Sequence, residues 1–183
     1  MDQGLIPRRY AKALYEVGEA RNVNEALYEL MERLSEAFAA TPGLSATVAN
    51  PFVNDADKTA LLITAAGEIS NNAAADTFKD FLHLLEQNGR AGIARDVALA
   101  FVDLYRKKHS IYRVLISSAA PMGAQEKERL ETIIAKHIGK GTMEYDYTVD
   151  PSLIGGFTVT VNSERLDASV SNELKQLRLS LVK

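Results

Sequence analysis

The side chains that most often bind metals are few in this sequence and far apart. The three histidines, His83, His109 and His137, have no second histidine or carboxylate at metal-ligand spacing, apart from charges expected on solvated helix faces. The chain has no cysteine, which excludes disulfides and thiolate ligands and fits a reducing cytosolic setting. We therefore expect no metal ion and no cofactor.

The residues suited to acid-base, nucleophilic or phosphate-binding chemistry also lack the necessary arrangement. Carboxylate pairs such as Glu16 and Glu19 lie opposite the apolar stripes, which is typical of solvated helix faces. Gly155-Gly156 leads directly into a predicted strand, without the Lys-Ser/Thr and helix of a phosphate-binding loop. Serines such as Ser117-Ser118 lie at predicted caps and strand ends. No active site is predicted, and an enzyme with a triad hidden in the fold stays a distant alternative.

Residues 6–108 show a helical period almost throughout. Apolar residues recur every three or four positions in three long stripes, and shorter helices are expected at 44–48, 56–66 and 73–87. The breaks carry capping or helix-ending residues, such as Asn54 and Asn88-Gly89. We predict an all-α six-helix bundle over residues 1–108. The three stripes are Ile6, Tyr10, Ala13, Leu14 and Val17; Leu27, Leu30, Met31, Leu34 and Phe38; and Ile93, Val97, Phe101, Leu104 and Tyr105.

After His109 the period changes from 3.6 to 2, which marks the start of a second domain over residues 109–183. Strands are expected at 111–118, 143–149 and 157–161. A helix over 124–138 lies between the first two strands, and its inward residues are predicted to be Leu130, Ile133, Ile134 and Ile138. A closing helix over 170–182 would keep Leu179 on its outer side. The fold class is thus an N-terminal helical bundle followed by a small α/β domain.

Two helices of the bundle carry more apolar surface than one core-facing stripe requires. On the first helix, Ala11, Tyr15 and Gly18 form a second stripe beside the one that contains Tyr10. On the fifth helix, Leu84 lies well off the inward-facing set. Burial within the bundle would explain each helix alone. Together, they would instead form the walls of a groove for an amphipathic helix of a partner.

Charge and hydropathy restrict the possible partners. Residues 1–106 contain 10 Lys and Arg against 15 Asp and Glu, and residues 107–183 contain 11 against 9. A nucleic-acid-binding regulatory protein needs a concentrated basic face, so it is the weaker alternative. No segment approaches the roughly 20 apolar residues of a bilayer span, and the N-terminus lacks the apolar run of a signal peptide. We expect membrane association only through a partner.

Four short segments follow one another in an informative order: RYAKALY at 9–15, NGR at 88–90, the stretch 114–121, and the stretch 150–169, which contains Gly155-Gly156. In this order and spacing the chain resembles, over essentially its whole length, the delta subunit of the bacterial F-type ATP synthase, the counterpart of the mitochondrial oligomycin-sensitivity-conferring protein. Two sites depart from the family pattern. Ala168 stands where the family commonly has Gly, and Met122-Gly123 where it usually has Leu-Ser/Thr.

The resemblance implies a non-catalytic peripheral-stalk, or stator, subunit at the cytoplasmic face of the bacterial inner membrane, which resists rotational torque during proton-driven ATP synthesis. Its N-terminal domain would bind the N-terminal helix of an alpha subunit of the F1 head, and its C-terminal domain would bind the end of the b subunits of F0. No homo-oligomer is required. The positions that match the family's alpha-subunit site include Tyr10, Ala13, Phe81 and Leu84. From the residue pattern we add Tyr15, in the second stripe of the first helix, for the alpha subunit, and Leu179, on the outer side of the closing helix, for the b subunit.

Overall fold

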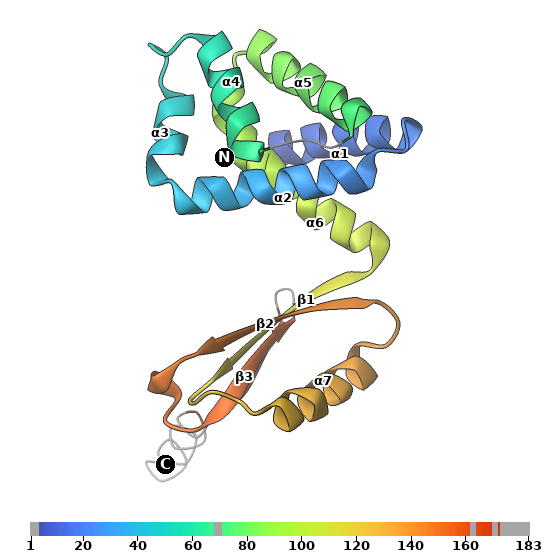
Figure 1. Ribbon diagram of the computed structural model, residues 1–183, viewed down its shortest axis with the longest axis vertical. Helices are drawn as coiled ribbons and strands as arrows, with labels where there is room; N and C mark the ends of the chain where they lie inside the picture. Colours follow the sequence, from blue (N-terminus) through green and yellow to red (C-terminus); the bar gives the residue numbers. More distant parts are fainter. Residues whose placement is uncertain (1–3, 68–70, 162–163, 170–171, 173–183) are drawn as a thin grey trace. The chain divides into compact units, whose positions relative to one another are not determined.

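The computed structural model describes residues 4–67, 71–161, 164–169 and 172, and the chain divides into two compact units, Met1–Tyr105 and Arg106–Lys183. The described residues form seven α-helices and a mixed sheet of four strands (Figure 1). The predicted combination of a mostly helical chain with a small α/β region is confirmed. The helices are α1 (Leu5–Ala20), α2 (Asn24–Ala40), α3 (Pro42–Ala49), α4 (Asp55–Ala66), α5 (Asn72–Gln87), α6 (Ala94–His109) and α7 (Ala124–Ile138), with the 3-10 turns η1 (Ala91–Ile93) and η2 (Pro151–Leu153).

Most of the core of the N-terminal unit comes from the apolar stripes of α2, α5 and α6 that the helical period predicts. Every member of the α2 stripe is buried, and so are Phe78, Phe81, Leu82 and Leu85 of α5. The breaks are capped as expected at two places. The Asn54 side chain accepts a hydrogen bond from the Ala56 amide at the start of α4, and Gly89 adopts a positive φ of 63° after α5.

Helix α1 uses the second of its two apolar stripes for the core. Ala11, Tyr15 and Gly18 are buried, whereas Tyr10 is half-buried and Val17 is exposed. Gly18 permits this choice, because a Cβ atom there would lie 2.1 Å from the Asn24 Oδ1 and 2.8 Å from the nearest Leu27 atom. The close approach of α1 and α2 therefore leaves Tyr10, Ala13 and Val17 of the other stripe outside the core, whereas Leu14 of that stripe is buried.

In the C-terminal unit, the strands are β1 (Ile111–Ser118), β2 (Thr142–Val149), β3 (Gly156–Val161) and β4 (Glu164–Ser169), in the order β2-β1-β3-β4. Strand β1 pairs in parallel with β2 and antiparallel with β3, which pairs antiparallel with β4. Helix α7 connects the two parallel strands and lies along one face of the sheet (Figure 1). The core between them consists of Val114, Ile116, Leu130, Ile134 and Val159.

Two features of this unit differ from the sequence-based expectation, and a third expectation is not tested. Ile133 was predicted to point inward, but its side chain is 64% exposed, because the buried face of α7 is narrower than the stripe suggested. Strand β4 was not predicted, since its sequence ERLDAS has little apolar alternation. The predicted closing helix over 170–182, including Leu179, lies outside the described residues apart from residue 172.

Candidate partner-binding sites

An apolar groove lies between α1 and α5 in the N-terminal unit, with a volume of about 220 Å³. Each helix contributes one stripe whose members recur every three or four residues, so both stripes follow the groove along its length. Helix α1 provides Tyr10, Ala13, Leu14, Val17 and, at its end, Arg21, while α5 provides Thr77, Asp80, Phe81 and Leu84.

The groove has a buried floor and accessible apolar walls. Leu14 and Phe81 are buried and join the floor to the core of the unit. The Tyr10 ring meets the Phe81 ring edge-on, with the ring centres 6.4 Å apart. Val17 and Leu84 stand on opposite walls with much of their side chains exposed to solvent. This edge-on aromatic contact supports the walls from the core side, and the outer surface of the walls stays available to a partner.

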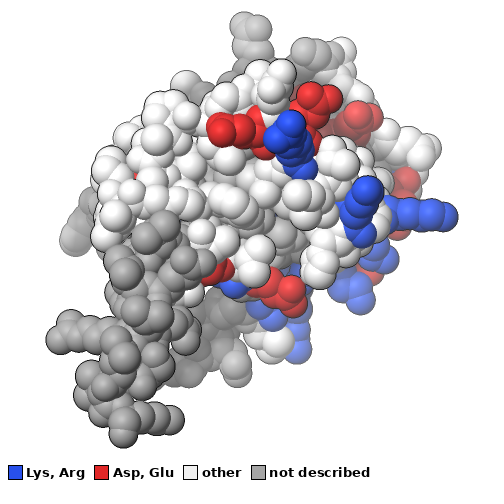
Figure 2. All heavy atoms as spheres, turned by 90° about the horizontal axis from the view of Figure 1, so that it is seen from below, with Lys and Arg blue, Asp and Glu red and all other residues white. Residues whose placement is uncertain are grey.

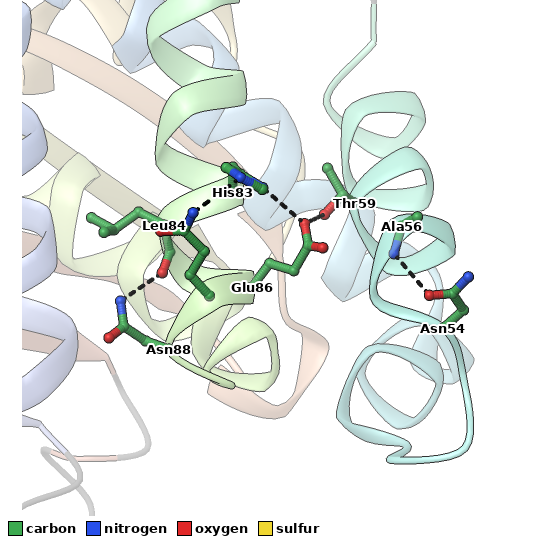
Figure 3. Close-up of polar contacts among 8 residues, drawn as sticks. Asn54, Ala56, Thr59, His83, Leu84, Glu86 and Asn88 are labelled. Carbon is green, nitrogen blue, oxygen red and sulfur yellow. Dashed lines mark hydrogen bonds and ion pairs between the residues drawn. The ribbon is translucent and has the colours of Figure 1, made fainter.

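The close-up in Figure 3 shows how α5 presents Leu84. On the side of α5 facing α4, Glu86 accepts a hydrogen bond from Thr59 and lies 3.3 Å from the His83 Nδ1. The Leu84 side chain points away from these contacts. Its carbonyl oxygen accepts a bond of 2.7 Å from the Asn88 side chain. One side of α5 is thus held to α4 by the Thr59–Glu86 hydrogen bond, and the side with Leu84 faces the groove.

Two polar ties connect the groove-forming helices, one at each end. At the end of α1, the Arg21 Nη1 donates to the Thr77 Oγ1 at 2.9 Å and to the Asp80 Oδ2 at 3.3 Å. At the other end, the Arg90 Nη1 donates to the Tyr10 hydroxyl at 3.0 Å, and the guanidinium lies 5.8 Å from the centre of the Tyr10 ring. These bonds fix the spacing of α1 and α5 before any ligand is present.

Four of the six predicted site residues lie together in this groove, namely Tyr10, Ala13, Phe81 and Leu84. Tyr15 does not: it is buried against Phe101 and Tyr105, with ring centres 6.2 and 6.5 Å away. Burial, with a smaller contribution from Glu19, raises the pKa of Tyr15 above its ordinary value. A partner could reach Tyr15 only by opening the core, so the structure does not leave it available. Leu179 lies outside the described residues.

Sequence reasoning missed the polar ends of the groove. Arg21, Thr77 and Asp80 come from two helices 56 or more residues apart in the chain, and no local periodicity connects them. The place of Val17 in the groove could have been predicted, because Val17 belongs to the same apolar stripe as Tyr10.

A second hollow, with a volume of about 620 Å³, lies in the C-terminal unit. The first half of α7 forms one wall, and residues 118–122 and 154–157 form the other. Ile133 and Ile154 expose most of their side chains here. Ile154 has a φ of 66° and Gly156 a φ of 76°, so a tight turn leads into β3. The Asp150 carboxylate accepts from the Ser152 amide at 3.0 Å just before this turn. Hydrogen bonding to the Ser152 side chain, and then to its amide, lowers the Asp150 pKa.

The described residues contain no group of three or more His, Cys, Asp or Glu side chains that is placed to hold a metal ion. Acidic and basic side chains lie beside one another on the face shown in Figure 2, and the coloured residues there form no continuous basic surface. A nucleic-acid-binding platform therefore gains no support from this face. Within residues 4–67, 71–161, 164–169 and 172, none of the helices combines the length and hydropathy needed to span a bilayer.

Comparison with known proteins identifies the family. The model of the ATP synthase delta (OSCP) subunit matches residues 6–181. The chain belongs to the ATP synthase delta (OSCP) subunit family. It is 35% identical to the ATP synthase subunit delta of Bacteroides thetaiotaomicron and 32% identical to that of Parabacteroides distasonis, covering 100% of this chain and 96% and 98% of those proteins.

The structural comparison agrees with this family. A chain in the cryo-EM structure of the Toxoplasma gondii mitochondrial ATP synthase hexamer shares the fold, with a TM-score of 0.69 and 22% sequence identity over 97% of both chains. As a delta-family member, the chain is a peripheral-stalk subunit of an F-type ATP synthase and thus part of a membrane-associated complex.

Proposed function

We propose that this delta-family subunit is a non-catalytic clamp with two binding surfaces. The N-terminal domain, a six-helix bundle over residues 1–108, binds the N-terminal helix of an alpha subunit of the F1 head. The α/β domain over residues 109–183 binds the C-terminal end of the b subunits. In a bacterial cell the subunit would lie at the cytoplasmic face of the inner membrane and resist torque during proton-driven ATP synthesis.

The observation that carries this proposal is the groove between α1 and α5. Its two walls repeat at helical spacing, which is the arrangement that accepts an amphipathic helix through anchors at positions i, i+3, i+4 and i+7. A docked helix would remove Val17 and Leu84 from water. Full burial of side chains of this size contributes about 1.5–3 kcal/mol each, before the entropic cost of association is subtracted.

Resistance to torque depends on binding energy and on rigidity, and the groove offers both. The ties from Arg21 to Thr77 and Asp80, and from Arg90 to Tyr10, hold α1 and α5 in place, so little ordering is left to the moment of binding. Phe81 anchors the floor to the core. A force applied to the docked helix would therefore pass into the packed interior of the domain.

For the stalk end, the hollow in the C-terminal unit is the best-supported contact surface among the described residues. Ile133 and Ile154 form an exposed apolar pair at its rim, where burial by a partner would be favourable. The b subunit is the partner that this part of the proposal assigns to it. Leu179, the residue expected to contribute from the closing segment, stays a prediction.

The groove proposal can be tested with a peptide of the alpha-subunit N-terminal helix from the same organism. Calorimetric titration should show that Leu84→Asp weakens binding at least about thirtyfold, because a carboxylate would be forced into an apolar contact. Leu99→Asp is the matched control: Leu99 has the same exposed fraction of 45% but lies on α6, outside the groove. Equal affinities for the wild-type chain and Leu84→Asp would reject the groove as the alpha-subunit site.

A further inference from the structure

Arg21 lines one end of the groove and Arg90 contacts Tyr10 at the other end, and the two arginines differ in their electrostatic surroundings. Arg21 is balanced by the Asp80 carboxylate at 3.3 Å. Arg90 has only neutral contacts: the Tyr10 hydroxyl, the face of the Tyr10 ring, and a backbone bond from its own amide to the Leu85 carbonyl at 2.7 Å. Within the part of the chain that the structure describes, no carboxylate pairs with Arg90.

An exposed arginine is usually only solvated, but Arg90 is held in a specific place. Its guanidinium is fixed above Tyr10, a residue that lines the groove, and the backbone bond to Leu85 holds the turn after α5. A guanidinium has five N–H donors. When one of them donates to a neutral hydroxyl, others can still donate to a planar acceptor such as a carboxylate. At the other end of the groove, the charge of Arg21 is already balanced by Asp80, so the two ends differ in the charge that they can offer a partner.

We propose that Arg90 recognises a carboxylate on the helix that occupies the groove. This inference rests on the proposed function and adds a chemical requirement for the partner. The occupant is an amphipathic helix with an aspartate or glutamate beside its apolar face, at the end that lies over Tyr10. Apolar contacts with Val17 and Leu84 supply adhesion, and the ion pair at Arg90 fixes the position of the helix along the groove.

The position of Arg90 at an end of the groove makes this pairing favourable. A docked helix would cover Tyr10 and exclude part of the water around the guanidinium, which strengthens the attraction to a carboxylate. Because Tyr10 already restricts the Arg90 side chain, less conformational entropy is lost when the pair forms. Loss of either partner should therefore weaken binding by about tenfold, mainly through faster dissociation.

The test is a double-mutant cycle between the full-length chain and the alpha-subunit N-terminal peptide. One side compares wild type with Arg90→Gln. The other compares the parent peptide with a series in which each Asp or Glu is replaced singly by Asn or Gln. We expect Arg90→Gln and one amide peptide each to raise Kd about tenfold and their combination to add less than about twofold more. Arg95→Gln, at an exposed arginine on α6, is the control and should change Kd less than about twofold.

Ionic strength provides a second readout that a purely structural Arg90 would not affect. Added salt should weaken peptide binding to the wild type more steeply than binding to Arg90→Gln, because the variant has lost the charge pair. Thermal unfolding followed by circular dichroism checks that the variants are folded. Uniform losses for all peptides, with no coupling to any acidic position, would overturn the inference and leave Arg90 as a support for Tyr10.

The outcomes also separate this inference from the proposed function. Peptide binding that depends on Leu84 but shows no coupling to Arg90 removes only the carboxylate requirement. Absence of peptide binding to the wild type removes both.

Discussion

The groove of the N-terminal unit and the hollow of the C-terminal unit are formed by different kinds of secondary structure. The groove lies between two regular helices, has a volume of about 220 Å³, and is closed at each end by a bond between side chains. The hollow measures about 620 Å³ and has one helix and two irregular segments as walls. Helix periodicity and packing therefore determine the first surface, whereas turn geometry around Ile154 and Gly156 determines the second.

This difference predicts different binding behaviour. Because the groove is already ordered, little conformational entropy is lost on binding, and its affinity for a partner depends on the fit of a few apolar anchors. The hollow is wider and bordered by Glu126 and Arg129 as well as by apolar residues, so its partner must cover a larger and more polar surface. The subunit would then select its partner at the groove by shape, whereas its affinity at the hollow would depend on the area of surface that the partner buries.

The strongest test of this comparison is Ile133→Asp. Because Ile133 is 64% exposed at the rim of the hollow, the substitution should leave the fold intact and raise the Kd for the b subunit at least about tenfold. Binding of the alpha-subunit peptide should not change. Leu166→Asp is the matched control, since Leu166 is 66% exposed on β4 but does not line the hollow. Equal losses of b-subunit binding in the two variants would show that the hollow is not the contact.

A smaller effect is expected from Gly18→Ala, which tests how tightly helix packing sets the groove. The new methyl group would lie 2.1 Å from the buried Oδ1 atom of the half-buried Asn24 and 2.8 Å from the buried Leu27 side chain. Overpacking costs about 1–3 kcal/mol, and the higher helix propensity of alanine offsets up to about 1 kcal/mol. We expect a net loss of about 1 kcal/mol in the free energy of unfolding in urea, and weaker binding of the alpha-subunit peptide.

Gly43→Ala is the control for this experiment, because Gly43 lies in α3 with no neighbouring atom within 4 Å of the added methyl group. It should not destabilise the chain. A Gly18→Ala variant that is as stable and binds as well as Gly43→Ala would contradict a groove fixed by close packing.

The smallest expected effect concerns Tyr147 of β2, whose hydroxyl connects the sheet to α7. Its hydroxyl donates to the Glu131 carboxylate, and Lys127 lies 4.4 Å from the ring centre. Burial, followed by the hydrogen bond and charge of Glu131, raises the Tyr147 pKa well above its ordinary value of 10.0. Tyr147→Phe should reduce the free energy of unfolding at pH 8 by about 1 kcal/mol, the typical net contribution of one hydrogen bond.

The pH dependence of this loss has a definite sign. Above pH 10 the unfolded chain releases the Tyr147 proton, while the folded chain retains it, so the contribution of Tyr147 is complete below pH 10 and is lost as pH rises above it. The difference in unfolding free energy between wild type and Tyr147→Phe should therefore shrink between pH 9 and pH 11. A difference that stays constant over this range would argue against the raised pKa.

Much of the fold follows from the sequence because local periodicity fixes it. The stripe of α2 is apolar on one side only, and every predicted member is buried. Helix α1 is ambiguous, since both of its stripes are apolar. The core takes the stripe with Tyr15 together with Leu14, and the close contact of Gly18 with α2 that accompanies this choice is not encoded by the helical period. Strand β4 is recognised only through its pairing with β3, because its own residues do not alternate between apolar and polar.

The candidate site shows the same division between local and long-range information. Leu84 is displaced from the inward set of α5, and this displacement is visible in the helical period. The tie between Tyr10 and Arg90 joins residues 80 positions apart, and that between Arg21 and Thr77 joins residues 56 positions apart. Such pairs depend on how distant helices pack, which no local pattern encodes.

The separation of Tyr10 from Arg90 also bears on the order of assembly in the cell. Helix α1 is synthesised first. The opposite wall of the groove and the hydrogen bond from Arg90 to Tyr10 can form only after α5 and Arg90 have been synthesised. Until then α1 exposes its apolar stripe without a partner helix, and the groove does not exist. Under the proposed function, nascent chains shorter than this should not bind the alpha-subunit helix, so that binding would wait until the groove is complete.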